Sequence, residues 1–304
     1  MTRSNFGLGC WSYGSAEPGS DAERTAVRVI RAAYEQGVRH FDTAQDYGDG
    51  RSEEIVGPAL EGKADAELAT KSRLVPAAET ASVVRTSLSR LRRETVDLFY
   101  IHWPRTGVDF RPMLEALETE RSRGTIKRIG VSNFSAEQLE RASEVARIGV
   151  HQVGYSLLWR YPEREVVPYC RAHGIETYSY SSLAQGLLTG KMPRLPSFAP
   201  GDPRPNTVFY QDDVWPHVHE GLTRMTEVAR EAGASLHHLA LRWLVDRAGA
   251  ARVLVGAKSE PQLADNLAAF GSEALPQALE ELERISDEVH EHIPDVGNIF
   301  QYYP

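Results

Sequence analysis

Residues 37–48 read GVRHFDTAQDYG, an apolar run followed by a polar stretch that ends in glycine. The run up to Phe41 predicts a short buried strand that stops at Asp42, and Tyr47 follows on the loop. Enzymes built on α/β barrels and sheets hold their reactive side chains at such strand ends. Asp42 and Tyr47 are therefore candidate functional residues, and the rest of the chain can be compared with this pattern.

Three further polar residues, Lys71, His102 and Asn133, each stand directly after an apolar run of the same kind. Counted from Asp42, the steps between them are 29, 31 and 31 residues, which is about the length of one βα unit. Taken singly, a loop tyrosine, a strand-end lysine or a histidine beside a tryptophan has an ordinary packing or solvation role. Their recurrence at one spacing favours a shared site at one end of a barrel.

The alternation of strand and helix patterns continues along the chain. Eight strand candidates, each followed by a helix, predict an α/β fold, a single (β/α)8 TIM barrel domain over residues 1–304. Residues 191–216, after the seventh strand, are rich in proline and predict a long functional loop, and residues 295–304 predict an irregular aromatic tail with Phe300, Tyr302 and Tyr303. The predicted strands are residues 6–11, 38–41, 67–71, 96–102, 126–131, 150–153, 175–180 and 252–255, and the predicted helices are about residues 21–36, 52–60, 77–93, 112–123, 135–146, 162–172, 218–231, 235–247, 261–269 and 276–290.

Composition narrows the functional classes. The chain has 304 residues and a formal net charge of −8, and interspersed charges with a negative balance argue against a nucleic-acid partner. No stretch approaches the roughly 20 apolar residues of a membrane span, and no signal peptide is evident. Cys10 and Cys170 lack metal or redox spacing and indicate buried thiols of a reducing compartment. We expect a cytoplasmic protein that acts on a small molecule, with no membrane partner.

The strand-end residues permit general acid catalysis. Tyrosine donates a proton poorly near neutral pH because its reference pKa is about 10. An adjacent Lys71 ammonium would favour the Tyr47 phenolate and lower that pKa, and Asp42 would hold the ammonium charged and in place. His102 could donate to a carbonyl oxygen or orient it. No side chain supplies hydride, so this chemistry implies a cofactor.

These residues lie in a set of motifs through which the chain resembles the aldo-keto reductase family, NADP-dependent oxidoreductases with a TIM-barrel domain. Each motif alone is weak, but together they span nearly the whole chain. The matching pieces are FDTA, YG and SE within residues 41–53, ATK at 69–71, IHWP at 101–104, GVSNF at 130–134, Gln152 with Tyr155, LAQGLLTGK at 183–191, and Gly256 and Ala257 followed by Gln262 and Asn266.

The resemblance implies a role for each matching residue. It implies that NADP(H), with NAD(H) as the alternative, supplies hydride to an aldehyde or ketone. The implied catalytic tetrad is Asp42, Tyr47, Lys71 and His102; the implied cofactor contacts are Ser132, Asn133 and Gln152 with the nicotinamide amide, Tyr180 under the nicotinamide ring, Ser181, Leu183 and Gln185 along the pyrophosphate, and Gly256, Ala257, Lys258, Gln262, Asp265 and Asn266 at the adenosine end.

Three residues, at two places in the chain, depart from the family pattern. Ser182 stands where many members have proline, and Lys258 and Gln262 replace the common serine or arginine choices near the adenosine phosphate. Lys258 is the only cation in the turn before the helix from Pro261, where exposed amides already attract phosphate, so it favours the 2′-phosphate of NADP. Glu260 is the nearest candidate for the opposing role of binding a ribose diol.

Other interpretations stay open. Trp11 and Trp103 predict an aromatic substrate pocket, which fits a carbonyl compound, an alcohol or a sugar hemiacetal, and the reaction could run in the oxidative direction. The chain could instead be a cofactor-binding regulatory subunit. The pair His40 and Asp42, with Lys71 and His102, resembles the start of a metal-dependent barrel hydrolase, but later strand ends offer amides and Tyr180 in place of ligands, so we predict no metal.

Overall fold

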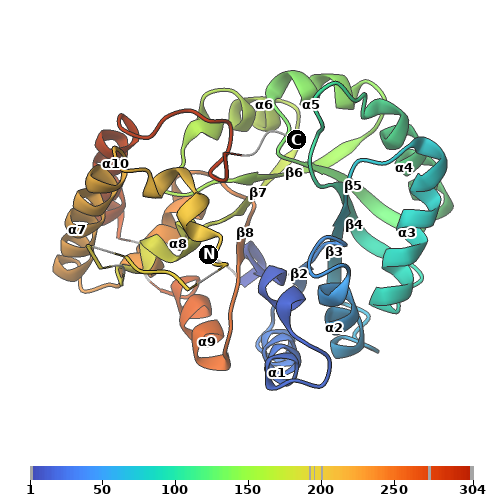
Figure 1. The fold of residues 1–304 in the computed structure, drawn as a ribbon, viewed down its shortest axis with the longest axis horizontal. Coiled ribbons are helices and arrows are strands. Elements are labelled where there is room, and N and C mark those ends of the chain that lie inside the picture. Colours follow the sequence, from blue (N-terminus) through green and yellow to red (C-terminus); the bar gives the residue numbers. More distant parts are fainter. Residues whose placement is uncertain (1–2, 192, 195, 200, 273–274, 302–304) are drawn as a thin grey trace.

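A computed structural model describes residues 3–191, 193–194, 196–199, 201–272 and 275–301. Eight parallel strands close into a barrel in chain order, so that β8 pairs with both β7 and β1 (Figure 1). The predicted (β/α)8 TIM barrel is confirmed. The strands are β1 (Phe6–Gly9), β2 (His40–Asp42), β3 (Glu67–Ser72), β4 (Val96–Ile101), β5 (Ile126–Ser132), β6 (Ile148–Gly154), β7 (Glu176–Tyr180) and β8 (Arg252–Val255).

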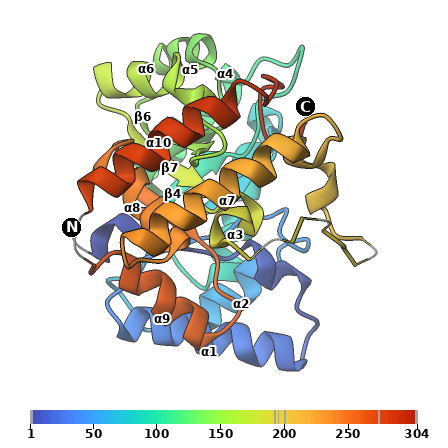
Figure 2. The same cartoon turned by 90° about the vertical axis from the view of Figure 1, so that its left-hand side faces the viewer.

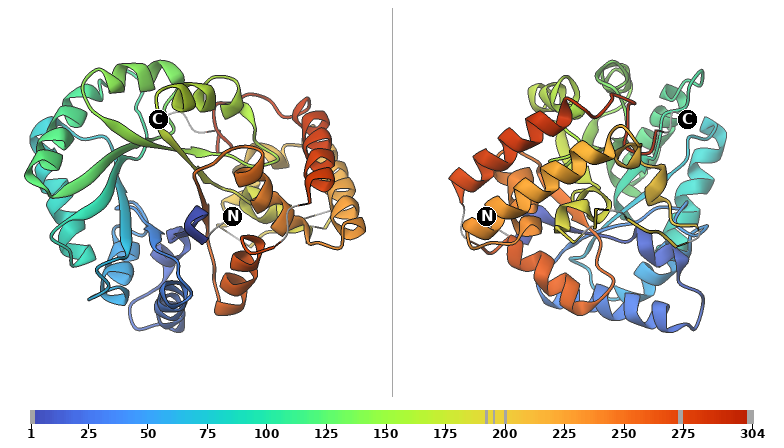
Figure 3. Two further views of the ribbon diagram at one scale, coloured as in Figure 1. Left: turned by 180° about the vertical axis from the view of Figure 1, so that it is seen from behind. Right: turned by 60° about the vertical axis from the view of Figure 1, so that its left-hand side comes forward.

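Helices surround the barrel. The pair α7 and α10 lies side by side on one flank (Figure 2), and from behind the orange and red helices gather opposite the cyan ones (Figure 3). None of the described helices is long and apolar enough to cross a membrane. The α-helices are α1 (Asp21–Glu35), α2 (Arg51–Ala59), α3 (Ala77–Leu91), α4 (Arg111–Arg123), α5 (Ala136–Ser143), α6 (Val166–Ala172), α7 (Trp215–Glu231), α8 (Leu236–Asp246), α9 (Glu260–Ala269) and α10 (Pro276–His290).

Local sequence explains where helices begin. Ser20 caps α1, because its hydroxyl accepts a hydrogen bond from the backbone N–H of Glu23. Gly50 precedes α2 with φ 94°, a conformation that favours glycine. Ser52, the predicted first residue of that helix, lies inside it, and its buried hydroxyl donates to the carbonyl of Cys10 at 2.8 Å. This bond ties α2 to the end of β1.

The first strand is shorter than predicted. It ends at Gly9, and Trp11 opens a 3-10 helix (Trp11–Ser15). The backbone N–H of Cys10 donates to the carbonyl of Asp42 at 2.8 Å, after which the chain turns away from the sheet. Cys10 and Cys170 are free, buried thiols, and burial raises the pKa of Cys170 to about 11, so both behave as core residues.

The core fills the barrel and the space beneath the helices. Phe6, Phe41, Phe99 and Ile129 are fully buried on β1, β2, β4 and β5. Neighbouring parallel strands run in matched register, as Phe41 opposite Leu68 shows, so their carboxyl ends meet at one mouth of the barrel.

The long loop and the tail meet each other. The described residues between 191 and 214 include two short 3-10 turns, Arg204–Asn206 and Val208–Tyr210. Helix α7 begins at Trp215, so Pro216 lies in the first turn of a helix and not in the loop. The backbone N–H of Val208 donates to Ile299 at 2.9 Å, and Phe300 packs half-buried against the core. Tyr302 and Tyr303 lie outside the described residues.

Candidate active site

The ends of β2 and β3 bring Asp42 and Lys71 into contact. The Lys71 ammonium lies 2.5 Å from Asp42 Oδ1 and donates to the carbonyl of Thr43 at 2.8 Å. The exposed fractions of the two side chains are 0% and 4%, so the charges are almost wholly removed from water. Asp42 Oδ2 accepts a second hydrogen bond, from Gln152 Nε2 at 2.8 Å. Such added hydrogen bonds are what a buried ion pair needs to be tolerated.

Tyr47 lies beside this pair. The Lys71 ammonium is 5.1 Å from the centre of the Tyr47 ring, and the ring of His102 meets that ring edge-on at 5.7 Å. The backbone of Tyr47 packs directly on Gly14, where an added Cβ would come within 2.5 Å of it. Glycine at position 14 therefore allows the loop to bring Tyr47 over the mouth. All four residues of the predicted tetrad gather in one place.

The electrostatics of Tyr47 differ from the expectation. Burial, reinforced by the negative charge of Asp42, holds the pKa of Tyr47 well above its ordinary value. The predicted lowering of this pKa by Lys71 is wrong for the structure as it stands. The physical reason is that burial disfavours the charged phenolate, and the negative charge of Asp42 disfavours it further. Tyr47 consequently keeps its proton through the neutral pH range.

His102 has an acidic partner that the sequence reading missed. Its Nδ1 lies 3.3 Å from Oδ2 of Asp46, whose other oxygen accepts from Arg73 at 2.8 Å. Burial raises the pKa of the Asp46 carboxyl, but His102 and Arg73 outweigh burial and hold that pKa below its ordinary value. Burial also lowers the pKa of His102, so the ring is neutral near pH 7. A carboxylate only accepts hydrogen bonds, so Nδ1 is the donor and Nε2 faces away with a lone pair. The only signal in the sequence is an acidic residue directly before Tyr47.

The predicted nicotinamide contacts join the same cluster. The Tyr180 hydroxyl donates to Asn133 Oδ1 at 2.7 Å, and Asn133 Nδ2 donates to the carbonyl of His102 at 3.1 Å and to the Ser132 hydroxyl at 3.0 Å. Asn133 holds a left-handed φ of 65°, which asparagine tolerates better than most residues. Gln152 reaches the group through Asp42.

The segment after β7 has an unusual backbone. Ser181 and Gln185 have φ values of 50° and 57°, uncommon outside glycine, and their side chains hydrogen-bond at 2.7 Å. Leu183 lies between them, directly before a 3-10 helix (Ala184–Thr189). The Ser182 hydroxyl donates to the carbonyl of Leu254 on β8 at 3.0 Å. The serine at this departure from the family pattern thus anchors the segment to the barrel.

The segment after β8 leads into α9. The backbone N–H of Lys258 donates to Gln262 Oε1 at 2.8 Å, while the Lys258 side chain is exposed. Asn266 Nδ2 donates to the carbonyl of Gly256 at 3.2 Å, and the Tyr13 hydroxyl donates to the carbonyl of Ala257 at 2.8 Å. Both contacts shape the turn from which α9 starts.

Asp265 stands apart from this arrangement. Its carboxylate lies 3.1 Å from Nε2 of His237 and 3.1 Å from Nε2 of His238, both on α8. No sequence pattern connects these residues, because 27 residues separate His238 from Asp265.

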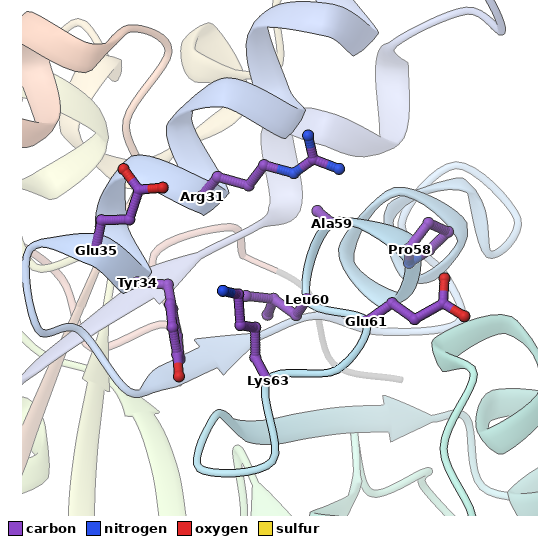
Figure 4. Close-up of a pocket in the computed structure, with 8 residues that line it drawn as sticks. All are labelled: Arg31, Tyr34, Glu35, Pro58, Ala59, Leu60, Glu61 and Lys63. Carbon is purple, nitrogen blue, oxygen red and sulfur yellow. The ribbon is translucent and has the colours of Figure 1, made fainter.

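The two predicted substrate-pocket tryptophans differ in burial. Trp103 is half-buried, with its ring 6.3 Å from that of His102, whereas Trp11 is 54% exposed. A separate hollow lies between α1 and the segment after α2 (Figure 4). Arg31, Tyr34 and Lys63 are among its lining residues, and none of the predicted site residues is.

His40 does not join Asp42 in a ligand cluster. Its Nδ1 faces Glu67 Oε2 at 3.6 Å, and its ring packs edge-on against Tyr178. Within the described part of the chain, the group of potential ligands whose atoms converge is His237, His238 and Asp265. The arrangement at the barrel mouth therefore favours proton transfer over metal-dependent hydrolysis.

Comparisons with known proteins agree with this geometry. The family model for the aldo/keto reductase family matches residues 5–287. The chain is 37% identical over 274 residues to the aldo-keto reductase YhdN of Bacillus subtilis, covering 86% of this chain and 83% of the relative. It is 29% identical over 297 residues to the NADH-specific methylglyoxal reductase of Escherichia coli, covering 89% and 90%.

Solved structures give the same result. The glycerol dehydrogenase AKR11B4 from Gluconobacter oxydans superposes with a TM-score of 0.86 at 32% identity, covering 97% of this chain and 93% of that one. An aldo/keto reductase from Klebsiella pneumoniae in complex with NADP and acetate has a TM-score of 0.75 at 26% identity, covering 93% and 91%. The chain belongs to the aldo/keto reductase family and is an NAD(P)H-dependent oxidoreductase.

Proposed function

We propose that the protein reduces an aldehyde or ketone to an alcohol with NADP(H), and that Tyr47 is the general acid. The observation that carries the proposal is the Lys71 ammonium, held between Asp42 and Thr43 and 5.1 Å from the Tyr47 ring. The cofactor, when bound, supplies hydride to the carbonyl carbon. Tyr47 passes its hydroxyl proton to the carbonyl oxygen, and the phenolate that forms lies next to a fixed positive charge. A positioned acid of this kind is worth roughly 10²–10⁴-fold in rate.

The residues present suit a nicotinamide cofactor. Asn133 and Gln152 carry the amide groups that pair with a carboxamide, and Tyr180 offers a half-buried ring beside them. At the other end, the exposed Lys258 stands two residues before the start of α9, and the positive end of a helix dipole attracts phosphate. Gln262 already binds the backbone N–H of Lys258, so its role is to fix the turn, and the lysine remains as the phosphate-binding cation.

The preference for NADP(H) rests on Lys258, and a nearby carboxylate opposes it. Hydrogen bonds from Arg204, together with the charge of Lys258, hold the pKa of Asp202 at about 2, so a loop carboxylate stands near this lysine and competes for its charge. The E. coli relative is named NADH-specific, whereas the K. pneumoniae relative was solved with NADP. NAD(H) is accordingly the alternative cofactor.

Asp46 acts as a positioning residue in this scheme. Because Nδ1 of His102 donates to Asp46, the neutral ring presents Nε2 as an acceptor. His102 in that state accepts a hydrogen bond from the substrate side, and it donates to a carbonyl only when protonated. Asp46 favours the protonated form, since its charge raises the pKa that burial lowers.

The oxidative direction is a second candidate, favoured by the similarity to the Gluconobacter relative, which is a glycerol dehydrogenase. The same residues serve it, with Tyr47 as the base in phenolate form. We place the aromatic side chains Trp11 and Trp103 at the substrate entrance. The test is a screen of aldehydes, ketones, alcohols and sugars with both cofactors. Steady oxidation of NADPH by a carbonyl compound supports the proposal, and cofactor binding without turnover of any of them contradicts it.

A further inference from the structure

The first turn of α8 and the middle of α9 carry a cluster that the proposed reaction does not use. His237 and His238 both direct Nε2 at the carboxylate of Asp265, and the three ligand atoms lie within 4.8 Å of one another. His237 is 12% exposed and His238 21%, while Asp265 is 54% exposed. The cluster is thus half-sheltered, with one open side.

Hydrogen bonding explains only part of this arrangement. Nε2 of His238 lies 2.9 Å from the Asp265 carbonyl and 3.1 Å from Oδ1, so its proton has acceptors. Nε2 of His237 is buried and makes no hydrogen bond of acceptable geometry, although Asp265 Oδ2 is 3.1 Å away. A buried nitrogen without a hydrogen bond carries a desolvation cost. Nε2 of His237 and Nε2 of His238 both point at the Asp265 carboxylate, as ligands of one metal ion would.

The three residues are close enough to share one ion. His237 Nε2 lies 3.1 Å from Oδ2 of Asp265 and His238 Nε2 lies 3.1 Å from Oδ1, and one ligand atom from each residue falls within 4.8 Å of the others. Ligand atoms about 2.0–2.1 Å from a tetrahedral Zn²⁺ stand about 3.3 Å apart. Two imidazoles and one carboxylate form a common protein set for zinc, with a fourth position left open.

The Lys191 ammonium acts electrostatically on His237. A positive charge there weakens cation binding, so we expect an affinity below that of a structural zinc site.

We propose that His237, His238 and Asp265 form a binding site for a first-row divalent transition metal such as Zn²⁺, which bridges α8 and α9. The inference goes beyond the proposed reductase reaction and revises the expectation from the sequence that the chain holds no metal. It also gives Asp265 a role other than the adenosine contact implied by the family resemblance.

The test is a titration of the chelator-treated full chain with Zn²⁺, in competition with a chromophoric chelator. The variants His237→Gln, His238→Gln and Asp265→Asn should each weaken the tightest site at least tenfold, because each removes one of three ligands. The matched control is His292→Gln, which breaks the stacked pair His217 and His292, whose rings lie 3.6 Å apart. Within the described residues no carboxylate completes a ligand group with that pair, so the control should bind zinc as the unmodified chain does.

Two further measurements separate this site from adventitious binding. Co²⁺ in place of Zn²⁺ should give the intense visible absorption of a tetrahedral ion, lost in all three variants. Zn²⁺ should raise the melting temperature of the unmodified chain and of His292→Gln but not of the variants. Unchanged zinc affinity in the three variants, an equal loss in His292→Gln, or a weak octahedral cobalt spectrum would each overturn the proposal. None of these readouts depends on enzyme activity, so failure here leaves the proposed reaction untouched.

Discussion

Lys71 and Lys258 are both assigned to the same reaction, but the Lys71 side chain is buried and paired whereas the Lys258 side chain is exposed. Lys71 has no exposed side-chain surface and is fixed by Asp42 and Thr43. The side chain of Lys258 is exposed, and it is the backbone N–H that is held, by Gln262. A fixed charge can act in the transition state without reorganisation. A mobile charge loses conformational entropy when it binds a phosphate, which reduces its net contribution.

The two lysines should therefore affect different quantities, Lys71 the turnover rate and Lys258 the affinity for the cofactor. Changes near Lys71 should lower turnover, whereas changes at Lys258 should alter cofactor binding and leave the chemical step alone. The four predictions below test this division, from the largest expected effect to the smallest.

Tyr47→Phe should lower turnover by roughly 10² or more and leave cofactor affinity within a few fold, since it removes one general acid and no cofactor contact. The measurements are steady-state NADPH oxidation with an aldehyde and a cofactor titration followed by fluorescence. Turnover like that of the unmodified enzyme would remove Tyr47 from the mechanism.

Lys71→Met should be nearly as damaging, about 10² in turnover, because the phenolate that forms on Tyr47 loses its neighbouring charge. It also leaves Asp42 buried without its partner, which costs about 3–5 kcal/mol of stability.

The matched control for Lys71→Met is the double variant Asp42→Asn with Lys71→Met, which removes both charges and should restore stability without restoring rate. Rates are compared per folded molecule, with the folded fraction taken from circular dichroism. Normal turnover per folded molecule in Lys71→Met would show that the lysine only supports folding.

Lys258→Ala should reduce the preference for NADPH over NADH by about tenfold to a hundredfold, the worth of a charge-assisted contact of about 1.5–3 kcal/mol. Turnover at saturating cofactor should stay the same. The dissociation constants of both cofactors are measured before and after the substitution. An unchanged ratio, or equal binding of both cofactors by the unmodified protein, would remove the assignment of NADP(H).

Asp46→Asn should lower kcat/KM only a few fold but move its pH dependence. Asp46 raises the pKa of His102, so its neutralisation lowers that pKa and shifts the limb set by His102 to lower pH. An NMR titration of the His102 ring checks the shift directly. The control is Asp49→Asn, at an exposed carboxylate two residues beyond Tyr47, which should change neither the pH dependence of kcat/KM nor the pKa of His102. A pH profile identical in Asp46→Asn and the unmodified enzyme would contradict the role of Asp46.

The sequence was sufficient for the fold because the regular alternation of apolar runs and polar strand ends is a local signal. It placed Asp42, Lys71 and His102 at strand ends, and register then brings them together. Boundaries were less accurate: β1 ends at Gly9, and a 3-10 helix begins at Trp11, where an extended strand was predicted.

Electrostatics at the site were the least predictable from sequence. The expected lowering of the Tyr47 pKa counted the Lys71 ammonium but not the burial of the phenol, which raises that pKa, nor the added effect of the Asp42 charge. Asp46 was missed because its partner His102 comes from another strand end. Burial and contacts between separate βα units depend on the folded chain, and spacing alone does not give them.

The central claim is that Lys71 acts on the reaction through Tyr47, and a double-mutant cycle tests it most directly. The single-turnover rate of NADPH oxidation is measured for the unmodified chain, Tyr47→Phe, Lys71→Met and the double variant, each corrected for folded fraction. If the two residues form one unit, the double variant should be within about threefold of Tyr47→Phe alone, because no phenolate remains for Lys71 to stabilise. Two independent effects would multiply to roughly 10⁴, and that result would contradict the account.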